Sequence, residues 1–191
     1  MPSPLAKDVQ ETATQAYGAV PNIFKETNRY TGVPGAVYVA ADTALMDGNL
    51  SPPEQQVVLL TMARYHNSRY DAVVHARMAL DAGLAPQGVD AILAGETLPH
   101  DRPQALVEAT ERSCEERGWL DAETLNDFEA RGVGRGELYE IFALIGMKTL
   151  TGFTSHLADP EVDGPLRSVE ASLEQVPDEP DTIERERLFM G

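Results

Sequence analysis

Hydrophobic positions recur every three to four residues along almost the whole chain, which is the repeat of an α-helix that is apolar on one side. Strict alternation of apolar and polar residues, the mark of a half-buried strand, is nearly absent. The pattern therefore predicts an all-α fold. The predicted helices span residues 5–17, 23–31, 33–46, 52–65, 68–82, 86–94, 102–117, 121–131 and 136–158.

Local signals mark the ends of the two central helices. Ser51 is predicted as the N-cap of the helix over residues 52–65, and Pro52 suits the first helical position because it has no N–H to leave unpaired. Glu54 can complete a capping box by accepting from the backbone of the N-cap. Gly83 is expected to end the next helix, since glycine adopts the left-handed conformation of a helix C-terminus without steric cost.

The chain is predicted to form one domain with two flanking segments. Residues 1–19 are expected to be an N-terminal arm, residues 20–165 the helical domain and residues 166–191 an acidic C-terminal extension. The extension ends in the apolar residues 188–190, which favour docking on a neighbouring subunit because their exposure to water costs free energy.

Composition narrows the classes of protein to consider. Among 191 residues, 31 are acidic and 15 basic, giving a formal charge of −16, which disfavours binding to the phosphate backbone of a nucleic acid. The sequence contains no run of about 18 apolar residues that could span a membrane. The N-terminus lacks the layout of a signal peptide, so a cytoplasmic protein is expected. The single cysteine, Cys114, cannot form an intrachain disulfide, which fits a reducing compartment.

Three polar residues share one face of the otherwise apolar helix over residues 68–82. Ser68, Asp71 and His75 are spaced i, i+3 and i+7, and the last two form an i, i+4 pair. A carboxylate at that distance can orient an imidazole and raise its basicity, so the spacing predicts an Asp71–His75 pair.

The segment SPPEQQVVLLTMARYHNSRYDAVVHARMALDAGL resembles the core signature of the carboxymuconolactone decarboxylase and alkylhydroperoxidase-D-like superfamily. The segments DAETLNDFEARGVGRGELYEIFALIGMKTLTGF and SHLADPEVD are similar to the usual ending of its members, and VPNIFK is typical of the peroxidase-related branch. The resemblance covers roughly residues 20–165. It implies an alkylhydroperoxidase-D-like helical domain that forms a homo-oligomer, from dimer to hexamer, with the apolar helix around residues 141–150 as a candidate contact.

The resemblance also implies where a site should lie. Peroxidase members carry Cys-x-x-Cys-x-x-x-His on this helix and a glutamate about three turns upstream. Here the cysteine positions fall on Ser68 and Asp71, the histidine is His75, and the glutamate position falls on Gln56, with Glu54 two residues earlier. A serine hydroxyl titrates far above a thiol and forms no disulfide, so the cysteine mechanism is not available at these positions.

Several functions stay open at this point. The first is a thiol-independent enzyme that uses His75 as a general acid or base on an unidentified small molecule. Ser68 could be a nucleophile or a hydrogen-bond donor, although two helical turns, roughly 10 Å, separate it from His75. A lyase of the carboxymuconolactone decarboxylase type and a non-catalytic binding or structural oligomer are the alternatives. A solvent-reaching cavity that contains His75 would favour an enzyme.

No cofactor or metal is assigned from the sequence. A glycine-rich phosphate loop after a strand is absent, and so is a compact metal motif such as H-E-x-x-H. The metal alternative would require four ligands to converge, namely His66, Asp71, His75 and His156, whose types suit zinc or iron.

Overall fold

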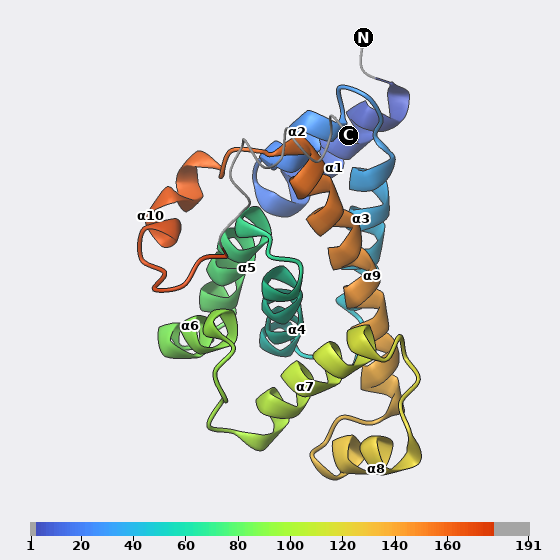
Figure 1. Cartoon of the computed structure of the whole chain (residues 1–191). Coiled ribbons are helices and arrows are strands. Elements are labelled where there is room, and N and C mark those ends of the chain that lie inside the picture. Colours follow the sequence, from blue (N-terminus) through green and yellow to red (C-terminus); the bar gives the residue numbers. More distant parts are fainter. Residues whose placement is uncertain (1–2, 178–191) are drawn as a thin grey trace, which may run out of the picture.

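The computed structural model describes residues 3–177 and consists of helices, with no strand among these residues (Figure 1). The predicted all-α fold is confirmed. The helices are α1 (Pro4–Tyr17), α2 (Asn22–Thr27), α3 (Val33–Leu45), α4 (Pro52–Tyr65), α5 (Arg69–Asp81), α6 (Pro86–Ala94), α7 (Asp101–Glu115), α8 (Ala122–Ala130), α9 (Arg135–Ala158), the 3-10 helix η1 (Gly164–Leu166) and α10 (Arg167–Glu170). None of them is both long and apolar enough to cross a membrane.

Helix α4 forms the centre of the molecule. Its residues 56–63 are all buried, and it packs against α5, α6, α7 and α9. Burial on every side explains why this helix reads as apolar all round rather than as one stripe. Its start follows the expected chemistry, because the Glu54 carboxylate accepts from both the backbone N–H and the hydroxyl of Ser51, at 2.9 and 2.6 Å.

A three-residue connection turns the chain from α4 into α5. Asn67 adopts a positive φ of 54°, and the Ser68 hydroxyl caps α5 by accepting from the N–H of Asp71 at 3.3 Å. The tight turn sets α5 directly against α4, so one face of α5 is buried against its neighbour.

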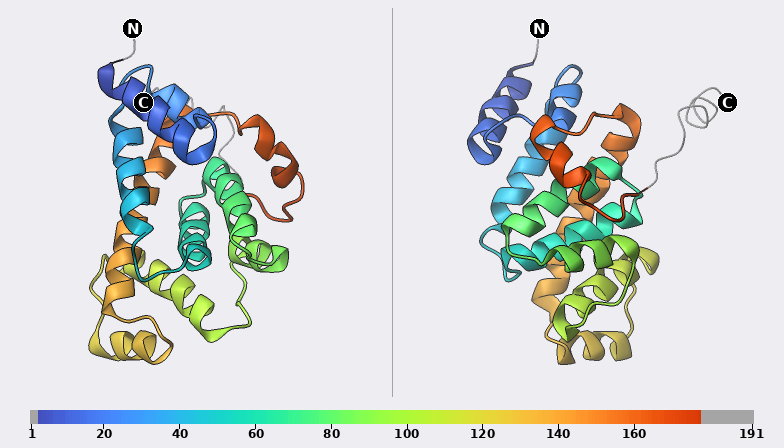
Figure 2. Two further views of the ribbon diagram at one scale, coloured as in Figure 1. Left: turned by 180° about the vertical axis from the view of Figure 1, so that it is seen from behind. Right: turned by 90° about the vertical axis from the view of Figure 1, so that its left-hand side faces the viewer.

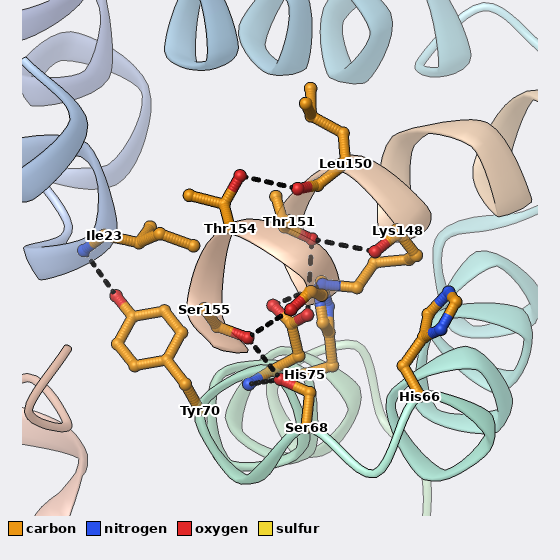
Figure 3. A network of polar contacts seen from close by, with 12 residues as sticks. Ile23, His66, Ser68, Tyr70, His75, Lys148, Leu150, Thr151, Thr154 and Ser155 are labelled. Atoms are coloured by element: carbon orange, nitrogen blue, oxygen red, sulfur yellow. Dashed lines mark hydrogen bonds and ion pairs between the residues drawn. The ribbon is translucent and has the colours of Figure 1, made fainter. Parts of the chain in front are cut away.

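Helix α9 is the longest element, and it packs on α2, α3, α4, α5 and α7. Lys148, Thr151 and Ser155 are spaced i, i+3 and i+7 on its buried side, and Figure 3 shows them pointing toward α5. This helix therefore supplies polar side chains to the interior from a part of the sequence far from α4 and α5.

Both flanking segments pack on the helical core within the described residues. Helix α1 buries Ala6, Val9 and Ala13 and lies against α3. After α9 the chain turns back, so that η1 and α10 lie beside α5 (Figure 2). The division into arm, domain and extension stays a prediction, and the apolar residues 188–190 lie outside the described part of the chain.

Candidate active site

A cluster of buried polar side chains lies where α4, α5 and α9 meet. Gln56 comes from α4, Asp71 and His75 from α5, and Lys148 and Thr151 from α9. All five residues are buried in a core that is otherwise apolar. Since an unpaired polar group in such surroundings costs free energy, the contacts within this cluster determine whether it is stable.

Lys148 lies at the centre of the cluster. Its Nζ is 2.5 Å from Oδ1 of Asp71 and 3.0 Å from Nε2 of His75. Figure 3 shows the side chain reaching from α9 to His75. Burial lowers the pKa of Lys148 from its ordinary value, and the Asp71 carboxylate opposes that shift. The carboxylate is thus the counter-charge that lets an ammonium group stay in the interior.

The contacts of His75 define its protonation. Nδ1 is 3.0 Å from Oε1 of Gln56, and an amide oxygen only accepts, so Nδ1 carries the proton. Nε2 then holds a lone pair, which accepts a hydrogen bond from the Lys148 ammonium. Burial, followed by the charge of Lys148, holds the pKa of His75 well below its ordinary value. The ring is therefore a neutral imidazole with one defined tautomer.

Asp71 meets Lys148 rather than His75. Its Oδ1 receives the ammonium, and its Oδ2 accepts from the Thr151 hydroxyl at 3.3 Å. Both ring nitrogens of His75 are engaged by Gln56 and Lys148, so the direct Asp71–His75 pair expected from the i, i+4 spacing is wrong. The carboxylate is drawn to the ammonium because a charge-assisted hydrogen bond is stronger than one to a neutral ring.

Ser68 serves the helix start and is separate from the cavity. Its hydroxyl accepts from the N–H of Asp71 and lies 2.9 Å from Oγ of Ser155. Ser155 donates its proton to the carbonyl of Gly152, so Ser68 is the donor in the serine pair. Both roles of the Ser68 hydroxyl are thus occupied within a fully buried site, and the structure gives no support to a nucleophilic serine.

Glu54 also lies apart from the cluster. It caps α4 and pairs with Arg102 of α7, with 2.5 Å between Nε and Oε1. Two positions along a helix correspond to about 200° of rotation, so Glu54 and Gln56 point to different sides. Of the two residues proposed for the upstream position, the structure brings only Gln56 to His75.

The remaining thiol and histidine candidates lie elsewhere. Cys114 is on α7 with its Sγ 3.5 Å from the sulfur of Met62, and burial together with nearby Glu115 and Glu111 raises its pKa to about 11. His66 contacts Thr149 at 3.2 Å. Within residues 3–177, no three His, Cys, Asp or Glu side chains come close enough together to hold a metal ion. The metal site that would require His66, Asp71, His75 and His156 to converge is therefore not formed in the described part of the chain.

A cavity of about 530 Å³ adjoins the cluster and is partly open to solvent. Asp71, His75 and Thr151 form its polar wall, while the fully buried Lys148 lies behind them. Apolar and aromatic side chains make up much of the rest, including Phe24, Tyr38, Tyr70, Val74, Met78 and Leu166. The volume lies in the range typical of sites for small organic ligands.

The outer wall of the cavity comes from the segment after α9. Asp163 accepts from the Tyr70 hydroxyl at 2.6 Å and from the backbone N–H of Asn22 at 3.0 Å. Arg69 forms an ion pair with Glu170 of α10. These contacts hold η1 against α5 and place Leu166 in the cavity lining.

Comparison with known proteins finds a family match in part of the chain and a shared fold over most of it. Residues 35–111, which run from α3 into α7, match the sequence model of the carboxymuconolactone decarboxylase family. The alkylhydroperoxidase AhpD core of an uncharacterized peroxidase-related protein from Ralstonia eutropha superposes with a TM-score of 0.74 at 16% identity, covering 93% of this chain and 96% of that one. Residues 35–111 thus carry the sequence pattern of the carboxymuconolactone decarboxylase family, and the chain as a whole has the fold of an alkylhydroperoxidase-D-like protein.

Two further solved structures share this fold. An uncharacterized peroxidase-related protein from Silicibacter sp. has a TM-score of 0.70 at 14% identity, covering 86% of this chain and 89% of its own. A cysteine-to-alanine variant of the debrominase Bmp8, in complex with 2,3,4-tribromopyrrole, has a TM-score of 0.68 at 16% identity, covering 90% and 92%. At such identities the likeness concerns the fold. A comparison with curated proteins finds no match.

Sequence reasoning missed Lys148, although a signal was available. It is the one charged residue in the apolar run FALIGMKTLTGF. The residues three and four positions away, Leu144, Ile145, Thr151 and Gly152, include no acid. A lysine without an acidic helical neighbour inside an apolar helix needs a partner from another element, and here that partner is Asp71.

Proposed function

We propose that this protein is a thiol-independent enzyme that moves a proton on a small organic molecule. Asp71 and His75 are the catalytic residues of this proposal, and Lys148 is the positioning residue that joins them. The observation that carries it is the placement of Asp71 and His75 on the wall of the cavity, with the Lys148 ammonium bonded to both.

The cavity favours an enzyme over a purely structural role. A protein that had kept only the fold would be expected to fill this space with apolar side chains, because a buried ion pair adds little stability over a hydrophobic replacement. Instead, a charged pair and a neutral imidazole lie beside an open space suited to a ligand. Groups with altered protonation in a cleft are a recurring feature of active sites.

The two catalytic residues suit different tasks. The Asp71 carboxylate can accept a proton from a ligand in the cavity. The His75 imidazole is held neutral, so it can accept a proton when the contact with Lys148 loosens. Thiol peroxidase chemistry is not part of the proposal, because Cys114 lies on α7, outside the cavity, and its pKa is raised to about 11.

The likeness to the debrominase adds a ligand type to the proposal. That structure contains a small halogenated aromatic ring. The cavity of the present chain has aromatic and apolar walls that suit a ligand of this type.

Proton exchange with solvent provides the test. The protein is incubated in D₂O with enolisable ring ketones and electron-rich aromatic compounds such as pyrroles, and deuterium incorporation into C–H bonds is followed by mass spectrometry. We expect incorporation into at least one class with wild type and a loss of at least about 100-fold with Asp71→Asn or His75→Gln. Asp127→Asn makes the same charge change as Asp71→Asn at an exposed position of α8 and is the control.

The outcomes separate the alternatives. Binding of these compounds without any exchange would replace the enzyme with a binding protein. Incorporation that survives both substitutions would show that the cluster does not perform the chemistry.

A further inference from the structure

The charges around the cavity are balanced before any ligand enters. On the polar wall the Asp71 carboxylate is matched by the Lys148 ammonium, while Thr151 and the neutral His75 add no charge. At the rim, Arg77 pairs with Asp81 at 2.7 Å. The other titratable and charged groups at or near the wall and rim are Lys25, His66, Tyr17 with its acceptor Asp42, Tyr38, Tyr70 and Asp163. Lys25 and Asp163 are opposite in sign, so the charges of the lining residues, taken together with Lys148, are balanced.

A balanced wall makes the cavity unfavourable for permanent anions. The Lys148 charge is already neutralised at 2.5 Å by Asp71, so a carboxylate ligand at the polar wall would place a second negative charge near Asp71, while the exposed Lys25 at the rim donates to Oδ1 of Asn22. Such a charge would lose its hydration and gain no partner. An uncharged ligand has no such cost, and the apolar walls favour it.

We propose that the cavity selects small ring-shaped weak acids in their uncharged form, of the phenol, pyrrole or enol type, and discriminates against permanent anions such as carboxylates. This inference rests on the proposed function and names its class of substrate. The ligand presents an X–H group to the Asp71 carboxylate and packs its ring against the apolar and aromatic walls.

Proton transfer within such a complex conserves charge. The X–H bond breaks, its electron pair stays on X, and an O–H bond forms on Asp71. The Lys148 ammonium, which lies behind the wall and still contacts the now neutral Asp71 and His75, becomes the counter-charge of the new anion. The step needs no oxidant or further reactant, and the total charge of the buried region is unchanged.

The same balance fixes how binding depends on pH. A weak acid that is already ionised in solution has to recover one proton from solvent to enter as a neutral complex. Its apparent affinity therefore falls about tenfold for each pH unit above the solution pKa of the ligand and is level below it.

The test uses two probes with the same ring and nearly the same size. Para-nitrophenol is a weak acid whose two protonation states absorb at different wavelengths, whereas para-nitrobenzoate is a permanent anion at neutral pH. Binding to the full chain is measured by calorimetry in two buffers of different ionisation enthalpy, which gives the number of protons taken up. We expect nitrophenol to bind at least about tenfold more tightly than nitrobenzoate. One proton is taken up for each bound nitrophenol above the solution pKa of the probe.

The variant Asp71→Asn tests whether the charge of Asp71 determines the ligand preference. It removes the carboxylate that keeps the Lys148 ammonium in the interior, so a bound anion would take over as the counter-charge of Lys148 and the preference should invert. Nitrobenzoate should bind more tightly than to wild type, and nitrophenol should bind as the coloured anion without proton uptake. The remote substitution Asp127→Asn should leave both affinities unchanged.

Three outcomes would overturn the inference: equal or tighter binding of nitrobenzoate to wild type, binding of nitrophenol above its pKa without proton uptake, or no binding of nitrophenol at all. None of these decides the enzyme proposal, which is tested by deuterium incorporation. Conversely, binding of nitrophenol with the expected selectivity but without exchange of any C–H proton would support the ligand selectivity and contradict the enzyme proposal.

Discussion

Lys148 of α9 and Asp71 of α5 form an ion pair of 2.5 Å although their side chains are only 1% and 5% exposed. The two residues are far apart in the sequence, and their contact joins the helix that carries His75 to the longest helix of the molecule. The pair therefore has both a structural and a chemical consequence.

Removal of the ammonium should destabilise the fold. Lys148→Met leaves the Asp71 carboxylate buried without its counter-charge, so the free energy of unfolding should fall by about 3–5 kcal/mol. Denaturation with urea measures the change. The exposed Lys25→Met is the control and should lie within about 0.5 kcal/mol of wild type. A loss below about 1 kcal/mol for Lys148→Met would mean that the ion pair does not persist in solution.

Stability should depend on pH through His75. Its pKa in the folded protein lies well below the ordinary value of 6.5, so the unfolded chain binds a proton that the folded chain does not. The free energy of unfolding is therefore highest, as far as His75 is concerned, above pH 6.5. It falls by about 1.4 kcal/mol per pH unit as the pH decreases toward the pKa of His75 in the folded protein. His75→Gln should flatten this dependence, whereas His100→Gln, at an exposed position, should not. An unchanged slope in His75→Gln would assign the dependence to other groups, such as His66.

Exchanging an amide and a carboxylate should change the pKa of His75 at position 56 but not at position 54. Gln56→Glu places a carboxylate at Nδ1 of His75, which favours the imidazolium, so the pKa of His75 should rise. Glu54→Gln weakens a helix cap and an ion pair, costing about 1 kcal/mol, with the pKa of His75 unchanged. NMR titration of the His75 ring distinguishes the two variants. A shift of equal size in both would contradict the separation of Glu54 from the site.

Cys114 should be a slow nucleophile in the folded protein. A pKa raised from 9.0 to about 11 lowers the thiolate fraction about 100-fold at pH 8. Alkylation by iodoacetamide should therefore be slower than in the urea-unfolded chain by at least this factor. Turnover of an organic hydroperoxide with a dithiol should be absent in both wild type and Cys114→Ser. Hydroperoxide turnover that disappears in Cys114→Ser would restore thiol chemistry.

The exposed face of α9 is a candidate surface for self-association. Tyr139, Phe142, Phe153 and Leu157 recur at helical spacing and are exposed in the single chain. We expect a homo-oligomer in solution whose mass, measured by light scattering, decreases when Phe142 and Phe153 are both replaced by serine. The double variant Tyr30→Ser/Met46→Ser removes exposed apolar side chains elsewhere and is the control. A monomeric wild type would refute this expectation.

The sequence was sufficient for the fold and for part of the cluster. Helical periodicity and the Ser51–Glu54 capping box located α4, and one polar face of α5 identified Asp71 and His75. The partners of these two residues could not be read in the same way, because helical spacing describes contacts within a helix only. Lys148 reaches Asp71 through the packing of α9 on α5, and that packing is a tertiary property. From the sequence, Ser68 could not be distinguished from an active-site residue, because a helix cap and an active-site hydroxyl use the same residue type.

The outer wall of the cavity also follows from tertiary contacts, and it has a consequence for the order of assembly. Asp163 holds Asn22, 141 positions earlier in the chain, and Tyr70, 93 positions earlier. During synthesis on a ribosome, the helix that carries His75 emerges long before the segment that encloses the cavity. A chain ended after α9 would retain the buried ion pair but lack the η1 wall, so a cleft open on that side would replace the enclosed pocket.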